Sequence, residues 1–126
     1  MAGELITRTN RVEDLTTGTR VLTINDAGGT FTNLGASAAV IFTLPTGCPV
    51  GLEFTFVVLA ADYLWISTPD NKNGETIYMD TDTETGIAAA AIGHACTVVC
   101  LDSTTPGEQF AVKSMIGSFW GTGPSG

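Results

Sequence analysis

Apolar residues in this chain recur at every second position or in short solid runs, and almost nowhere at the spacing of an amphipathic helix. The segment LEFTFVVL shows the pattern, because Leu52, Phe54 and Phe56 alternate with Glu, Thr and Val. Successive side chains of a strand point to opposite faces, so one face of this segment is expected to face a core. The pattern predicts an all-β protein.

The same pattern occurs in eight segments, which are predicted to be strands: 20–25, 30–33, 39–44, 52–59, 63–67, 76–79, 96–102 and 109–115. Turn signals rich in Gly, Pro and Asn separate them. No helix is long enough to cross over a parallel sheet, so we expect an antiparallel β-sandwich, jelly-roll-like, or a β-barrel. The Ala-rich run 88–92 is too short for a stable helix and is predicted to be a loop or the edge of a strand.

The chain of 126 residues has the size of one domain. We expect an N-terminal arm over 1–19, a β domain over 20–120 and a flexible C-terminal tail over 121–126. The arm has only scattered apolar residues, and arms of this kind reach a neighbouring subunit. Leu5, Ile6, Arg8 and Arg11 are therefore the candidate contact residues.

Charge limits the partners of the chain. Thirteen acidic residues against five basic ones leave a formal net charge of -8. Binding to nucleic acid or to an anionic membrane requires clustered Lys and Arg, so we expect neither partner. The N-terminus has no apolar segment of signal-peptide length, and the chain has no run of eighteen apolar residues. We therefore expect synthesis in a cytosol.

The three cysteines are Cys48, Cys96 and Cys100, an odd set without the spacing of a disulfide framework. We expect free, mostly buried thiols. His94 lies two positions before Cys96, so a Cys-His nucleophile pair or a metal site must be considered. On one strand the thiols of Cys96 and Cys100 are about four steps of about 3.3 Å apart, too far to share a zinc ion. Buried thiols and a partly exposed histidine remain the favoured interpretation.

Two other groups of residues could bind a ligand. Asp80, Asp82 and Glu84 alternate like the start of a calcium loop, but the turn Gly falls one place late and Ala91 stands where a bidentate Glu belongs. A solvated acidic loop is favoured, calcium stays open, and no cofactor is expected. Five aromatic residues could form a sugar-stacking platform, although aromatic residues in strands more often form core: Tyr63, Trp65, Tyr78, Phe119 and Trp120.

The order of several motifs resembles a β-rich module of bacteriophage virion proteins. They are FTNLGASAAVIFTLPTGCPVGLEFTFVV, then YLWIS, a Gly-containing loop before ETIYM, then GHACTVVCL and QFAVKSMIGSFW. The shared features are a Thr-Asn-x-Gly-Ala segment, a Leu-Pro corner, a Gly before an aromatic strand, a Gly-Asp/Glu-x-Ile step, and a late strand followed by a Gly and a Trp, here Gly117 and Trp120. The resemblance covers about residues 21–120. It does not assign the acidic DTDTET segment or the cysteines.

Such modules occur in head decoration (cement) proteins and in tail fibres or spikes, usually as trimers. The chain begins with Met1 and has little besides the module, so we expect a stand-alone decoration protein without enzymatic activity. The resemblance implies a virion location on the outer capsid surface, with the major capsid protein and other copies of the chain as partners. Leu5, Ile6, Arg8 and Arg11 would then contact the capsid or a subunit. The alternative is a tail fibre or spike module that binds a host-surface glycan.

Overall fold

The computed structural model describes residues 11–70, 74–79, 82–104 and 107–121. This part of the chain contains one short 3-10 helix, η2 (Ile24–Asp26), and eleven strands. The strands are β1 (Val12–Asp14), β2 (Gly18–Val21), β3 (Thr30–Thr32), β4 (Val40–Thr43), β5 (Glu53–Val57), β6 (Leu64–Ser67), β7 (Thr76–Met79), β8 (Asp82–Glu84), β9 (Gly86–Ala89), β10 (Ala95–Asp102) and β11 (Gln109–Ile116).

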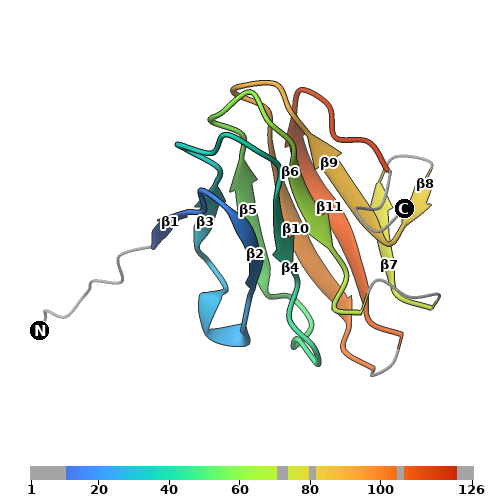
Figure 1. The fold of residues 1–126 in the computed structure, drawn as a ribbon. Helices are drawn as coiled ribbons and strands as arrows, with labels where there is room; N and C mark the ends of the chain where they lie inside the picture. Colours follow the sequence, from blue (N-terminus) through green and yellow to red (C-terminus); the bar gives the residue numbers. More distant parts are fainter. Residues whose placement is uncertain (1–10, 71–73, 80–81, 105–106, 122–126) are drawn as a thin grey trace, which may run out of the picture.

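The strands form two sheets, so the all-β prediction is confirmed. The larger sheet has seven strands in the order β1-β3-β5-β10-β11-β7-β8, and the smaller has four in the order β2-β4-β6-β9 (Figure 1). Side chains of both sheets meet in a single cluster of buried residues. The two sheets therefore face each other across one core.

The chain alternates between the two sheets from β1 to β7. As a result β1, β3 and β5 are parallel neighbours in the larger sheet, and β2, β4 and β6 are parallel neighbours in the smaller one. In the described residues, five of the nine named strand pairs run parallel, so the prediction of an antiparallel fold is wrong. Parallel neighbours need a long crossover, which is usually a helix. Here the crossover is a strand of the opposite sheet.

The eight predicted strands correspond to β2 through β7, β10 and β11, with shifts at their ends. Three strands escaped prediction for different reasons. β1 and β8 are only three residues long and too polar to stand out. β9 consists of four buried residues, GIAA, so it shows no alternation. It ends at Ala89, so the Ala-rich run 88–92 begins in the last two residues of a strand, which agrees with the second of the two predicted alternatives, the edge of a strand.

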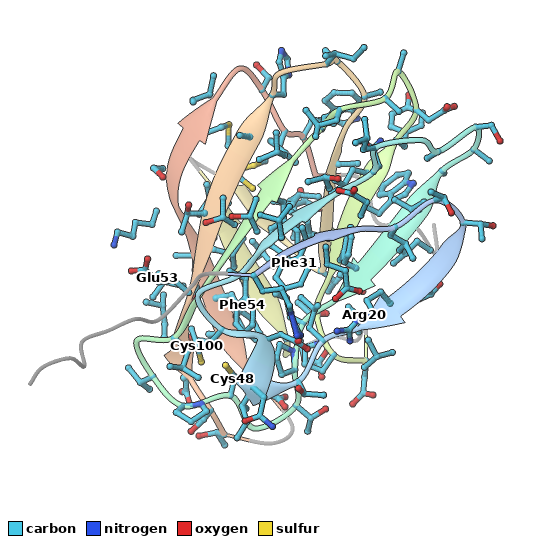
Figure 2. All side chains as sticks on the ribbon, turned by 90° about the vertical axis from the view of Figure 1, so that its left-hand side faces the viewer. Arg20, Phe31, Cys48, Glu53, Phe54 and Cys100 are labelled. Carbon is cyan, nitrogen blue, oxygen red and sulfur yellow. The ribbon has the colours of Figure 1, made fainter. Side chains whose placement is uncertain are left out.

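Three phenylalanines join the two sheets at the centre of the core. Phe31 of β3 and Phe56 of β5 belong to the larger sheet, and Phe42 of β4 belongs to the smaller one. Their ring centroids lie 5.6 to 5.8 Å apart in tilted pairs, a favourable geometry for aromatic contacts. Phe31 and Phe54 both lie between the sheets (Figure 2). The core face predicted from LEFTFVVL is confirmed for Phe54 and Phe56, which are fully buried.

The connection from β4 to β5 passes from one sheet to the other through a Pro-Thr-Gly-Cys corner. Gly47 and Gly51 have φ of 63° and 95°, a left-handed conformation that favours glycine. The fully buried Glu108 accepts a hydrogen bond from the Gly47 backbone N–H at 3.1 Å through Oε2. The buried side chain of Glu108 therefore holds the corner in place. Among the described residues, no helix has the length and apolarity to cross a membrane.

Candidate functional site

Arg11 is the one candidate contact residue of the arm within the described part of the chain; Leu5, Ile6 and Arg8 lie outside it. Arg11 Nη2 donates a hydrogen bond to Asp26 Oδ1. The backbone carbonyl of Arg11 also accepts a hydrogen bond from Thr30 N–H at 2.8 Å. Within the predicted arm, residues 12–14 form β1 and residues 18 and 19 begin β2. Arg11 thus contacts the body of the protein.

Asp26 is the centre of this charged cluster, and its side chain is 3% exposed. Besides Arg11, its carboxylate accepts hydrogen bonds from Thr23 N–H at 2.8 Å and from Arg20 Nη2 at 3.1 Å. Burial raises the pKa of Asp26, but the hydrogen bonds from Thr23 and Arg11 and the charge of Arg20 outweigh it, and the pKa stays below its usual value. The carboxylate is therefore ionised and firmly held.

Arg20 connects Asp26 to the first strand. Its Nε and Nη2 donate to the two carboxylate oxygens of Glu13 at 2.6 and 3.1 Å, a bidentate pair. The hydrogen bond with Glu13 raises the pKa of Arg20, although burial opposes this rise. The labelled Arg20 lies near η2 in Figure 2. The cluster fastens β1, β2 and η2 to one another, so its role in the molecule is structural.

A shallow hollow of about 270 Å³ lies on the larger sheet. Its lining residues are Thr55, Ala95, Cys96, Thr97, Ser114, Met115 and Ile116. Thr55, Ala95 and Thr97 alternate with buried residues along β5 and β10, so they point away from the core. The hydroxyls of Thr55 and Thr97 are hydrogen-bonded at 3.0 Å. None of the lining side chains carries a charge at neutral pH.

The lining of the hollow includes one strongly exposed apolar residue, and a charged pair lies on the same sheet. Ile116, at the end of β11, is 68% exposed. The ion pair between Glu53 and Lys113, at 2.5 Å, joins β5 to β11 on the same sheet. Outward positions could be recognised in the sequence by alternation. The sequence did not show that β5, β10 and β11 lie side by side. Their neighbouring positions in the sheet bring the lining residues together.

Three of the five aromatic residues proposed as a platform come together on the smaller sheet. The centroid of Tyr63 lies 5.5 Å from that of Trp65 and 5.8 Å from that of Trp120. Tyr78 lies on β7 of the larger sheet, and Phe119 is buried in the core. Three of the five candidate aromatic residues therefore lie together, whereas Tyr78 and Phe119 do not join them.

The three cysteines are buried and free, as the sequence predicts. Burial raises the pKa of Cys48 and of Cys96 to about 12 each, and it also raises the pKa of Cys100. The Cys100 thiol donates to the Cys48 carbonyl at 2.9 Å, and both labels lie together in Figure 2. At neutral pH these thiols are protonated, and protonated thiols are poor nucleophiles.

His94 supports a turn at the end of β11. The backbone N–H of Ser118 lies 3.1 Å from His94 Nδ1, and a methyl group at Gly117 would come within 2.3 Å of the imidazole ring. The histidine thus packs against residues 117 and 118, while the thiol of Cys96 is buried and protonated. This arrangement favours the structural interpretation of both residues.

Of the proposed calcium ligands, Asp80 lies outside the described residues, as does the side chain of Asp82. The third, Glu84, ends β8, and its side chain packs so closely on Gly121 that a Cβ there would lie 2.0 Å from its Cγ. In the part of the chain that the structure describes, no three His, Cys, Asp or Glu side chains are grouped to hold a metal ion.

Comparison with known proteins assigns no family to this chain. No protein-family model matches it, and no curated protein sequence matches it.

Proposed function

We propose that this protein is a non-enzymatic virion structural protein, a head decoration (cement) protein that binds the outer capsid surface and stabilises the shell. The motif order over residues 21–120, which resembles phage virion modules, supports this role. The observation that carries the proposal is the uncharged lining of the hollow on the larger sheet, which includes Thr55, Thr97, Ser114 and the exposed Ile116.

Such a face suits contact with another protein. Burying a charged side chain in an interface costs free energy unless the charge is paired. Burying Thr, Ala or Ile has a much smaller desolvation cost. The centres of protein interfaces are depleted in charged residues for this reason. We assign the face to contacts between copies of the chain, in a homotrimer as the resemblance implies.

The capsid contact in this proposal belongs to the arm residues Leu5, Ile6 and Arg8, with the major capsid protein as partner, because the fourth candidate, Arg11, is held by Asp26. Binding that occurs only on the assembled shell lowers the free energy of the shell by the binding free energy, which is how a decoration protein stabilises it. The protein would be made in the host cytoplasm and function on the capsid surface.

We also propose that the fold is a β-sandwich. Two facing sheets with one shared core support a sandwich over a barrel. A jelly roll is built from antiparallel Greek keys, and the parallel neighbours β1, β3 and β5 do not favour it.

The location is tested by quantitative mass spectrometry of purified virus particles, with the major capsid protein as the internal standard. A copy number comparable with that of the capsid protein supports head decoration. A handful of copies would move the protein to the tail and favour the alternative, a fibre or spike module that binds a host glycan. Absence from the particle would overturn both.

The subunit contact is tested with Ile116→Asp and Ser114→Arg, which place a charge on the neutral face. We expect both variants to elute as monomers in size-exclusion chromatography with light scattering, while the unchanged protein elutes as a trimer. Thr19→Arg is the matched control, because Thr19 is exposed on β2 of the other sheet. A trimer that survives both charges would contradict the assignment of this face.

A further inference from the structure

The aromatic cluster of Tyr63, Trp65 and Trp120 is built on a row of paired residues. Trp65 of β6 lies opposite Ala88 of β9, and Ala88 lies opposite Trp120 in an isolated antiparallel bridge. Residues opposite one another across a sheet point to the same face. The small methyl of Ala88 therefore lies between two indole side chains on one face of the smaller sheet.

Trp120 is held there by its backbone. Its N–H donates to the Ala88 carbonyl at 3.0 Å, and the Ala88 N–H donates to the Trp120 carbonyl at 3.0 Å. The Tyr63 carbonyl is similarly held, by the N–H of Val40 at 3.0 Å. Trp120, in the segment after β11, thus forms a single β-bridge along β9, the edge strand of the smaller sheet. Main-chain hydrogen bonds thus fix the backbone from which the rings of Tyr63 and Trp120 extend.

The core does not account for this cluster. Leu64 and Ile66, the neighbours of Trp65 in β6, are fully buried and point to the opposite face. Tyr63 is 42% exposed and Trp120 is 44% exposed, so two large rings in the cluster stay in contact with water. Exposed apolar side chains are ordinary when scattered, but a contiguous aromatic group indicates a binding surface.

The chemistry of the cluster points to a sugar. A pyranose ring presents a flat face of C–H groups that can stack on an indole or phenol ring, and its hydroxyls can bond to polar groups beside the stack. Tyrosine and tryptophan supply both parts, an aromatic face and an O–H or N–H donor. The Tyr63 and Trp120 rings stand at 79° to each other, so they offer two differently directed surfaces to one ligand.

The charge of the protein limits the class of sugar that the platform can bind. Within the described residues, the basic side chains are engaged elsewhere: Arg11 and Arg20 in the cluster around Asp26, and Lys113 with Glu53 on the larger sheet. The Glu84 carboxylate, by contrast, packs on Gly121, the residue after Trp120. The net charge of the chain is -8. An acidic polysaccharide would be repelled, whereas a neutral or amino-bearing one would not.

We propose that Tyr63, Trp65 and Trp120 form a binding platform for a neutral or amino-bearing glycan. The platform lies on the sheet opposite the proposed trimer face, so the inference stands whether the protein decorates the head or belongs to the tail.

The chain offers a direct probe of this site, because its two tryptophans are both in the platform. Titration of the intact protein with chitohexaose, cellohexaose and glucosamine oligomers is followed by tryptophan emission and by isothermal titration calorimetry. We expect a saturable shift of the emission with at least one of these sugars, and no shift with polygalacturonate. No response to any neutral or amino sugar at millimolar concentration would overturn the proposal, as would a preference for polygalacturonate.

Substitutions test whether the sugar binds at the platform. Tyr63→Ala and Trp120→Ala should each lower the affinity at least tenfold, while Trp120→Phe, which keeps an aromatic face, should retain most of it. Tyr78→Ala is the matched control, because Tyr78 is 40% exposed on the larger sheet. The affinity of the Tyr78→Ala variant for the sugar should equal that of the unchanged protein. Binding that is lost in Tyr78→Ala and kept in Trp120→Ala would place the sugar elsewhere and overturn the assignment.

Discussion

The carboxylate of Asp26 is paired with the guanidinium of Arg11, 15 positions earlier in the chain. Asp26 is buried at the end of η2, while Arg11 immediately precedes β1. Arg20 binds the same carboxylate oxygen at 3.1 Å from the strand between them. One buried acid thus joins the start of the described chain to the turn that leads into β3.

Replacing Asp26 by Asn should destabilise the protein. The substitution removes the charge that holds two arginines, and we expect the free energy of unfolding at pH 7 to fall by about 2 kcal/mol. Urea unfolding followed by tryptophan fluorescence measures the change. The control is Glu53→Gln, which breaks the exposed pair with Lys113 and should cost less than about 1 kcal/mol. Equal effects of the two substitutions would contradict a special role for Asp26.

The stabilisation by Asp26 should depend on pH. Because the pKa of Asp26 in the folded protein lies below its usual 3.8, the charged form is favoured by folding. The contribution is complete above the usual value and is lost as the pH falls through the lower folded-state value. The difference in unfolding free energy between the unchanged protein and Asp26→Asn should therefore shrink from pH 7 to pH 3. A constant difference over that range would contradict the assignment.

Truncation of Phe56 should be among the most damaging changes in the core. Phe56 contacts Phe31 on the neighbouring strand and Phe42 across the two sheets. Phe56→Ala leaves a cavity at this junction, and we expect a loss of about 4 kcal/mol in the free energy of unfolding. Val57→Ala, the next residue on the outward side of β5, should cost about 1 kcal/mol or less. Denaturant titration compares the two, and similar losses would contradict the proposed core position.

Gly117 and Gly18 form a matched pair for a test of the His94 contact. Their φ angles are 75° and 76°, so an alanine at either position pays a similar backbone cost of about 1 kcal/mol. A methyl group at Gly18 meets nothing within 4 Å, whereas one at Gly117 collides with the His94 ring. Gly117→Ala should therefore lower the melting temperature more than Gly18→Ala.

The double variant Gly117→Ala, His94→Ala separates the two causes. Removing the ring removes the collision, so much of the additional loss in melting temperature should be recovered. If the double variant is no more stable than Gly117→Ala alone, the loss comes from the backbone and not from the His94 contact.

The thiols of Cys48, Cys96 and Cys100 should resist alkylation in the folded protein. Burial raises the pKa of Cys48 and Cys96 to about 12, so at pH 8 very little thiolate is present, and access is blocked as well. Mass spectrometry after treatment with iodoacetamide should show no adduct in buffer and three adducts in urea. Rapid modification of Cys96 in the folded state would contradict this and would reopen the Cys-His interpretation.

The sequence by itself determined where most strands lie and which of their residues face the core. In LEFTFVVL, alternation alone assigned Phe54 and Phe56 to the interior, because the side-chain period of a strand is two whatever its neighbours are. The free, buried state of the three cysteines was expected on another ground, because their odd number and spacing do not form a disulfide framework. Strands without alternation, such as β9, or short and polar ones, such as β1 with its sequence VED, left no such signal.

Only the tertiary structure decided which strands lie side by side. The ladder bonds of a sheet join backbone groups that every residue except proline carries, so the local sequence does not say whether a neighbour is parallel or antiparallel. The winding of β1, β3 and β5 in one sheet, with β2, β4 and β6 in the other, depends on burying both inner faces at once. The same long-range pairing brings Trp120 beside Trp65, 55 positions earlier in the numbering, across Ala88.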